Sequence, residues 1–238
     1  MTTEHIVTSY EDELAGLDKK IAQMGGLTET LVTQAVDALR DRDTELASNT
    51  IKADAKVDEL QLEIEEQAIS MIARRQPMAL DLRQIMATVK ITADLERIGD
   101  LAKNIAKRTL SVHSEKQPSQ LKHGMRSMQE MALSQLKDVL DAYAERNTEK
   151  ALSVWRHDEE IDAIYNSLFR ELLTYMMEDP RNIGLCAHLL FCAKNLERIG
   201  DHTTNIAETV HYLVRGEAIT RERPKGDETS QMVVDQPK

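Results

Sequence analysis

Leu95-Glu96-Arg97-Ile98-Gly99-Asp100 occurs twice in this chain, because residues 196–201 repeat the same six letters. The identity resumes at Asn104-Ile105-Ala106, which residues 205–207 repeat at the same displacement of 101 residues. Six identical residues in a row are improbable by chance in a chain of 238 residues. We therefore interpret the sequence as a duplicated unit and predict the fold from the repeat.

The composition favours helices that pack on other helices. Aromatic residues make up 3% of the chain, Gly and Pro are scarce, and 30% of the residues are charged. Apolar residues recur at alternating spacings of three and four, as they do along one face of an α-helix, and no stretch alternates as a strand does. The six expected helices occupy residues 10–40, 43–74, 79–109, 121–143, 147–179 and 183–214.

This pattern predicts an all-α fold of two tandem antiparallel three-helix bundles, related by an internal pseudo-two-fold duplication. Short connections make neighbouring helices antiparallel. A polar stretch with one proline separates the halves, and the polar C-terminal end lacks helical periodicity, so we expect a disordered tail. The predicted parts are a first repeat at 1–112, a linker at 113–120, a second repeat at 121–215 and the tail at 216–238.

Charge and segment composition exclude several classes of function. The net charge of −11 argues against nucleic acid as a ligand, because phosphate binding needs a basic face. No signal peptide is visible, and no apolar run approaches the roughly 20 residues that cross a bilayer. We expect a cytoplasmic protein that meets a membrane only through partners. Cys186 and Cys192 lie six apart on one helix, so we expect two free core thiols.

Carboxylates recur four residues apart in both repeats, a spacing that puts two side chains on the same face of a helix. One pair in each repeat lies inside the hexapeptide, and the other lies in the preceding helix. The eight candidate metal ligands are Asp54, Asp58, Glu96 and Asp100 in the first repeat and Asp158, Asp162, Glu197 and Asp201 in the second.

The two pairs of each repeat are expected at the same height. Both helices of an antiparallel hairpin rise about 1.5 Å per residue, so residues equally far from the turn lie level. Asp54 and Asp100 are equally far from Pro77, and so are Asp58 and Glu96. The second repeat gives the same result around its own proline turn. Whether the two faces also point toward each other does not follow from spacing.

Four carboxylates this close together repel one another unless a cation lies between them. Oxygen ligands suit magnesium, calcium or manganese, and can also hold iron or zinc. A single pair of this kind usually lies on a solvated face, so the metal prediction rests on four pairs that are duplicated and level. The sequence contains no H-E-x-x-H, no G-x-S-x-G and no phosphate-binding glycine loop. We therefore predict no enzymatic activity.

Taken together, the motifs resemble the PhoU family of bacterial phosphate-uptake regulators. The resemblance rests on the duplicated hexapeptide, on the paired aspartates, and on Arg75-Gln76-Pro77 followed by Asp81-Leu82-Arg83. It covers the chain apart from the tail and implies two three-helix bundles. It further implies a cytoplasmic regulator that docks on the ATPase subunit of the phosphate ABC transporter and on the sensor histidine kinase of the phosphate regulon. Such a regulator restrains signalling and uptake when phosphate is plentiful.

The resemblance also implies metal. In some members of the family the E/D-x-x-x-D motifs hold multinuclear iron or zinc clusters, and those motifs fall here on the eight acidic residues given above. Magnesium or manganese is the alternative. The second repeat lacks the R-Q-P and D-L-R motifs, so the two halves need not bind equal partners. We expect a homodimer.

Two alternatives stay open. A metal-dependent oxidase or metal-storage bundle needs paired E-x-x-H motifs. Glu208 and His211 make one such motif, but Lys107 and Leu110 occupy the equivalent positions of the first repeat. A purely structural helical adaptor is the other alternative, and it predicts that neutralising the carboxylates is harmless or stabilising.

Overall fold

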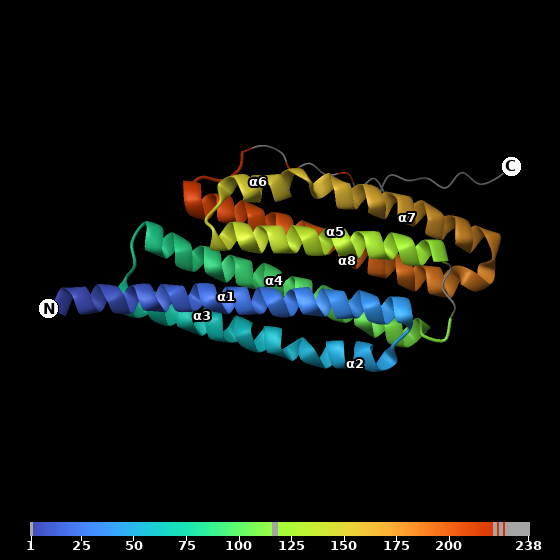
Figure 1. The fold of residues 1–238 in the computed structure, drawn as a ribbon, viewed down its shortest axis with the longest axis horizontal. Helices are drawn as coiled ribbons and strands as arrows, with labels where there is room; N and C mark the ends of the chain where they lie inside the picture. The colour runs from blue at the N-terminus through green and yellow to red at the C-terminus, as the bar shows by residue number, and fades with distance from the viewer. Residues whose placement is uncertain (1, 116–118, 221–222, 224–225, 227–238) are drawn as a thin grey trace.

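The computed structural model describes residues 2–115, 119–220, 223 and 226. Over these residues the chain forms α-helices and one 3₁₀-helix, with no strand (Figure 1). The elements are α1 (Thr2–Asp41), α2 (Thr44–Ala53), α3 (Ala55–Arg75), α4 (Leu80–Val112), α5 (Ser119–Ala144), α6 (Thr148–Arg156), α7 (Asp158–Glu178), the 3₁₀-helix η1 (Pro180–Asn182) and α8 (Ile183–Arg215). The all-α prediction is confirmed.

The six predicted helical rods are present, but the middle rod of each repeat is divided into two helices. The first repeat consists of α1, the rod α2–α3, and α4, and the second consists of α5, the rod α6–α7, and α8. The division falls at Asp54 in one repeat and at His157 in the other. The prediction of one unbroken helix over 43–74 and one over 147–179 is therefore wrong at one position in each range. These two positions adjoin the candidate site.

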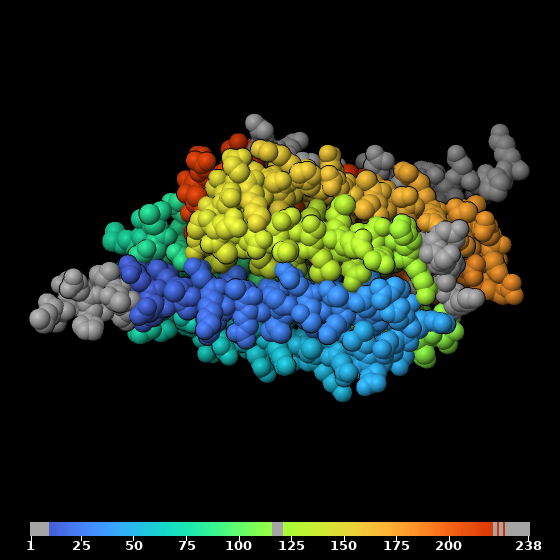
Figure 2. Space-filling model, viewed as in Figure 1, coloured from blue at the N-terminus to red at the C-terminus, as the bar shows by residue number. Residues whose placement is uncertain are grey.

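The two bundles lie side by side with their long axes roughly parallel (Figure 1). Helix α4 packs against α8, and α1 packs against α5, so the contact between the repeats runs along both pairs. In the space-filling view α1 and α5 touch along most of their length (Figure 2). The two helices that carry the duplicated hexapeptide therefore meet in the middle of the molecule.

The predicted apolar seams form one continuous core through both repeats. Leu17, Ile21 and Met24 on α1 are buried, as the spacing predicts. Cys186 and Cys192 are buried and free, which confirms the prediction of two core thiols. None of the described helices is both long and apolar enough to span a membrane.

Caps define the helix ends near the loops. The Asp43 carboxylate accepts hydrogen bonds from the backbone N–H groups of Glu45 and Leu46, and α2 begins at the next residue. Asn147 caps α6 in the same way. Gly216 ends α8 with a φ of 81°, a left-handed conformation that suits glycine. Most of the tail expected to be disordered, and residues 116–118 of the expected linker, lie outside the described residues.

Candidate functional site

The paired carboxylates lie close together in both repeats, at the matching heights that counting residues from the proline turns predicted. We call Asp54, Asp58, Glu96 and Asp100 the first carboxylate cluster, and Asp158, Asp162, Glu197 and Asp201 the second carboxylate cluster. In the first cluster, one lysine contacts acids on both rods. The Lys103 Nζ atom lies 2.5 Å from Asp54 Oδ2 and 3.1 Å from Asp100 Oδ1. The faces therefore point toward each other, which spacing alone did not establish.

The first aspartate of each cluster lies at or directly after the break in its middle rod and is buried. The Asp54 carbonyl accepts a hydrogen bond of 2.8 Å from the N–H of Val57, a tight turn within the rod. In the second repeat His157 has a ψ of 12°, outside the helical range, and Asp158 begins α7. Asp54 and Asp158 are only 1% and 2% exposed. Each middle rod thus carries a buried carboxylate at or directly after its break.

Glycine in the hexapeptide makes room for this arrangement. A Cβ atom at position 99 would lie 3.1 Å from Asp54 Oδ1, and one at position 200 would lie 3.0 Å from Ile161 Cγ2. Both distances are tighter than ordinary contacts, so an alanine at either site would force the facing side chain of the middle rod to shift. Glycine inside a helix costs about 1 kcal/mol relative to alanine. Close approach of the middle rod explains why the hexapeptide contains a glycine.

The remaining acids of the first cluster are held at its rim. Burial raises the pKa of Glu96, the Arg97 guanidinium 3.5 Å away opposes that shift, and the charges of Asp100 and Asp58 add to it. Burial likewise raises the pKa of Asp54, against the effect of Lys103. The Asp54 Oδ1 atom is buried and accepts no hydrogen bond from the described residues.

In the second cluster the cation that bridges two helices is Arg223, which lies beyond the end of α8. Arg223 Nε donates to Asp158 Oδ2 at 2.7 Å, and its second terminal nitrogen donates to Asp158 Oδ1 at 2.8 Å and to Asp201 Oδ1 at 2.6 Å. Thr204 Oγ1 also donates to Asp158 Oδ1, at 2.8 Å. The backbone N–H of Gly226 donates to Asp162 Oδ2 at 2.8 Å.

Glu197 is the most deeply buried glutamate of the two clusters, with 4% of its surface exposed. Burial raises its pKa to about 7. Lys194, whose Nζ lies 2.9 Å from Glu197 Oε2, lowers that pKa, and the charges of Asp201 and Asp162 raise it. The second cluster is thus a set of close, partly desolvated carboxylates.

We tested whether these residues fit a metal ion. Among the described residues, no three His, Cys, Asp or Glu side chains converge in an arrangement that would hold one. Instead Lys103 and Arg223 lie between the carboxylates. The chemistry of the donors nevertheless fits a hard cation, since all eight are carboxylates and Asp54 Oδ1 is a buried acceptor without a donor. The residues that would hold the ion are those of the two clusters.

Sequence reasoning missed both internal cations. Lys103 lies three residues after Asp100 on the same helix, a spacing at which opposite charges pair, so this contact had a readable signal. Arg223 lies 22 residues beyond Asp201 in a polar segment without periodicity, so no local pattern pointed to it. Asn205, four residues after Asp201 on α8, donates a hydrogen bond to Asp94 on α4, and the His202 ring also contacts Asp94.

The isolated E-x-x-H motif does not assemble a site. Glu208 accepts a hydrogen bond of 3.0 Å from the indole of Trp155, and the His211 ring lies 3.2 Å from the carbonyl oxygen of Glu217. Both side chains therefore have contacts apart from the carboxylate clusters. This geometry weighs against the oxidase or storage alternative.

Comparison with known proteins covers nearly the whole chain. The family model described as "PhoU domain" matches residues 21–109 and 125–210, one segment in each repeat. The chain is 55% identical over 230 residues to the phosphate-specific transport system accessory protein PhoU homolog of Rhizobium meliloti (strain 1021), which covers 97% of both chains. It is 51% identical to the homolog of Caulobacter vibrioides (strain NA1000 / CB15N), over 96% of this chain and 100% of that one.

Solved structures agree with the fold. The crystal structure of PhoU from Pseudomonas aeruginosa matches with a TM-score of 0.84 and 39% identity, over 87% of this chain and 100% of that one. The structure of the phosphate transport system regulatory protein PhoU from Streptococcus pneumoniae matches with a TM-score of 0.82 and 30% identity, over 89% of this chain and 100% of that one.

Proposed function

This chain belongs to the PhoU family, and we propose that it is a non-enzymatic regulator of phosphate uptake and of phosphate-responsive two-component signalling. The observation that supports the proposal is the share of the chain that aligns with these relatives. Relatives named as accessory proteins of phosphate-specific transport align over 97% and 96% of the chain, so both repeats take part in the likeness. On this basis the chain is an accessory protein of that transport system. We propose that it restrains uptake and signalling while phosphate is plentiful.

We further propose that it acts in the cytoplasm by docking on two partners, the ATPase subunit of the phosphate ABC transporter and the sensor histidine kinase. The turn between α3 and α4 supports a docking role. Met78 and Leu80, two residues apart in that turn, are 81% and 66% exposed, which is unusual for two large apolar side chains so close in sequence. Gln76 and Ala79 have φ values of 46° and 50°, so the turn is held in a conformation that L-residues rarely adopt.

The arginines of the turn motifs hold this turn in place. Arg75 pairs with Glu13 on α1 at 3.0 Å. The Arg83 guanidinium lies over the ring of Tyr212 on α8, 5.6 Å from its centroid. The second repeat has neither motif at its own turn, so only the first repeat presents such a turn among the described residues. Unequal ends fit a regulator that binds different partners with its two halves.

The carboxylate clusters are proposed to hold iron or zinc in multinuclear sites, with magnesium or manganese as the alternative. A bound cation would neutralise the acids that α3, α4, α7 and α8 bring together, and so would link the middle rod of each repeat to its last helix. Four carboxylates per cluster and the buried acceptor Asp54 Oδ1 support this proposal.

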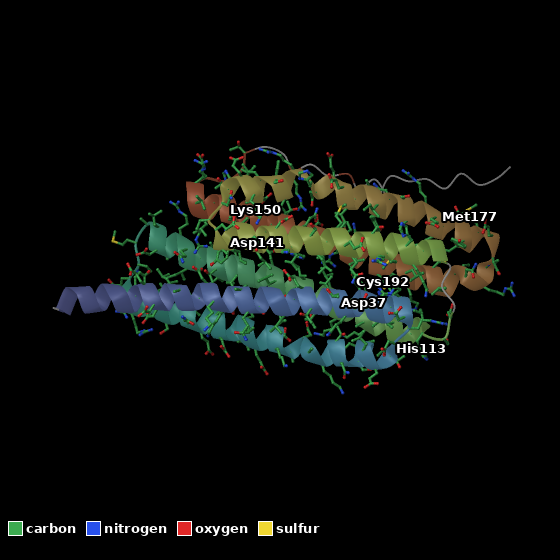
Figure 3. All side chains as sticks on the ribbon, in the orientation of Figure 1. Asp37, His113, Asp141, Lys150, Met177 and Cys192 are labelled. Carbon is green, nitrogen blue, oxygen red and sulfur yellow. The ribbon has the colours of Figure 1, made fainter. Side chains whose placement is uncertain are left out.

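A gene deletion in the protein's own host tests the regulatory proposal. Expression of phosphate-starvation genes should rise while phosphate is abundant, and the wild-type gene should restore repression. Met78→Asp should fail to restore it if the α3–α4 turn docks on a partner. Met177→Asp is the matched control, since Met177 is 60% exposed near the end of α7 in the second repeat (Figure 3). Unchanged expression in the deletion strain, with transport intact, would contradict the proposed regulation.

A further inference from the structure

Arg223 makes three hydrogen bonds with the second carboxylate cluster and joins two of its rods. It contacts both oxygens of Asp158 on α7 and one oxygen of Asp201 on α8, at 2.6–2.8 Å. Its side chain is 16% exposed, and that of Asp158 is 3% exposed. A two-pronged arginine–carboxylate pair in a nearly buried place is a strong, directional contact, unlike a surface ion pair.

A second residue of the same segment strengthens the arrangement. The Gly226 N–H donates to Asp162 Oδ2, and Asn166 Nδ2 on α7 donates to the Gly226 carbonyl at 2.6 Å. A Cβ atom at position 226 would lie 3.3 Å from the Asp162 Cβ atom, so glycine suits this close approach. Two described residues beyond α8 therefore engage three of the four acids of the second cluster.

The two repeats obtain their internal cation in different ways. In the first repeat the cation is Lys103, which is part of α4 and stays beside the cluster. The equivalent position of the second repeat holds Thr204, which can donate a hydrogen bond to Asp158 but carries no charge. Arg223 supplies that charge from beyond the end of α8. Arg223 therefore reaches the cluster from outside the helices that carry the acids, whereas Lys103 belongs to the helix that carries Asp100.

We propose that Arg223 is a built-in competitor for the metal at the second carboxylate cluster, so that metal binding there displaces Arg223 from Asp158 and Asp201. The inference rests on the proposed metal function. Arg223 uses the oxygens of Asp158 and Asp201 that a cation would use, and two positive charges at that distance repel each other. Occupancy of the second site is therefore coupled to the position of Arg223. The first site has no such coupling.

The test measures manganese(II) binding to the full chain by the loss of the free-ion electron paramagnetic resonance signal. The parent protein carries Glu96→Gln and Asp100→Asn, so that only the second cluster remains intact. Arg223→Gln in this parent should bind manganese at least tenfold more tightly. Arg126→Gln is the matched control, because it removes one positive charge from an exposed pair with Glu130 on α5, and it should leave the affinity unchanged.

The outcomes separate the two proposals. Equal affinities of the parent and Arg223→Gln would overturn the competition and leave the metal site standing. No binding by either protein would overturn the metal site and the competition together.

A measurement in chelator tests the contact itself. The effects of Arg223→Gln and Asp158→Asn on the unfolding free energy should be strongly non-additive, because each removes one partner of the same pair. Additive effects would show that Arg223 does not occupy the cluster, and would overturn the inference.

Discussion

Replacing Lys103 with methionine tests the role of the internal cation in the first cluster. Methionine keeps the long apolar stem and the helix propensity of lysine and removes the charge. The Lys103 Nζ atom is 2.5 Å from Asp54 Oδ2, and the Asp54 side chain is 2% exposed. Without the lysine, a buried carboxylate loses its charged partner.

The expected loss of stability follows from that burial. Removing one partner of a buried ion pair costs about 3–5 kcal/mol. Lys103 is 24% exposed and Asp54 can take up a proton, so we expect a smaller loss of about 2–3 kcal/mol. For a chain of this size that corresponds to a fall in Tm of roughly 5–10 °C. Asp54→Asn in the Lys103→Met background should restore part of the loss, because a neutral amide needs no counter-charge.

Thermal unfolding followed by circular dichroism, in buffer with chelator, measures the effect. Lys107→Met is the matched control, since Lys107 is exposed one turn further along α4. Added zinc or iron should stabilise Lys103→Met more than the wild type, because the metal no longer competes with the lysine. Equal melting temperatures for Lys103→Met and Lys107→Met would refute the argument that Lys103 neutralises the cluster.

Three further predictions concern the architecture around the clusters. Gly26→Ala should stabilise the protein by about 1 kcal/mol, because no neighbouring group lies within 4 Å of the added Cβ. Gly200→Ala should destabilise the protein despite the same gain in helix propensity, because its Cβ would lie too close to Ile161. Urea unfolding that shows both variants stabilised would contradict the close approach at Gly200. Tyr143→Phe should cost about 1–2 kcal/mol at neutral pH, because the Tyr143 hydroxyl donates to Asp18 across the interface between the repeats. Burial and the Asp18 charge raise the Tyr143 pKa to about 12. Native Tyr143 therefore keeps its proton between pH 10 and 12, where the tyrosines of unfolded chains lose theirs, so the unfolding free energy of the wild type should fall over this window. A fall of equal size in Tyr143→Phe would count against the assignment. Cys186 and Cys192 should react with a thiol reagent at pH 8 only on unfolding, because both are buried and burial raises both pKa values, so rapid labelling of native protein would be the contrary result.

The spacing of apolar residues predicted the helical rods, and counting residues from the proline turns predicted that the paired carboxylates lie at the same height. Counting from Pro77 worked because the rise per residue of a helix is nearly constant, and the contacts of Lys103 with Asp54 and Asp100 confirm that register. The apolar seams also predicted which face of each rod is buried, since burial follows the helical period.

The kinks and the C-terminal cation did not follow from the sequence. Neither Asp54 nor His157 is a proline or a glycine, and the residues around them favour helix, so no local signal marked the breaks. Arg223 reaches the second cluster from a segment without periodicity, and which acids it contacts depends on how α7 and α8 pack together. Contacts of this kind are set by tertiary structure.

The presence of metal at both carboxylate clusters is the claim on which the mechanism depends most. Anomalous diffraction from crystals grown with excess zinc or iron measures it directly. The account predicts anomalous peaks among Asp54, Asp58, Glu96 and Asp100 and among the matching acids of the second cluster, with Arg223 moved away from Asp158. Crystals with excess metal in which both clusters show no peak, and in which Lys103 and Arg223 still lie between the carboxylates, would contradict it.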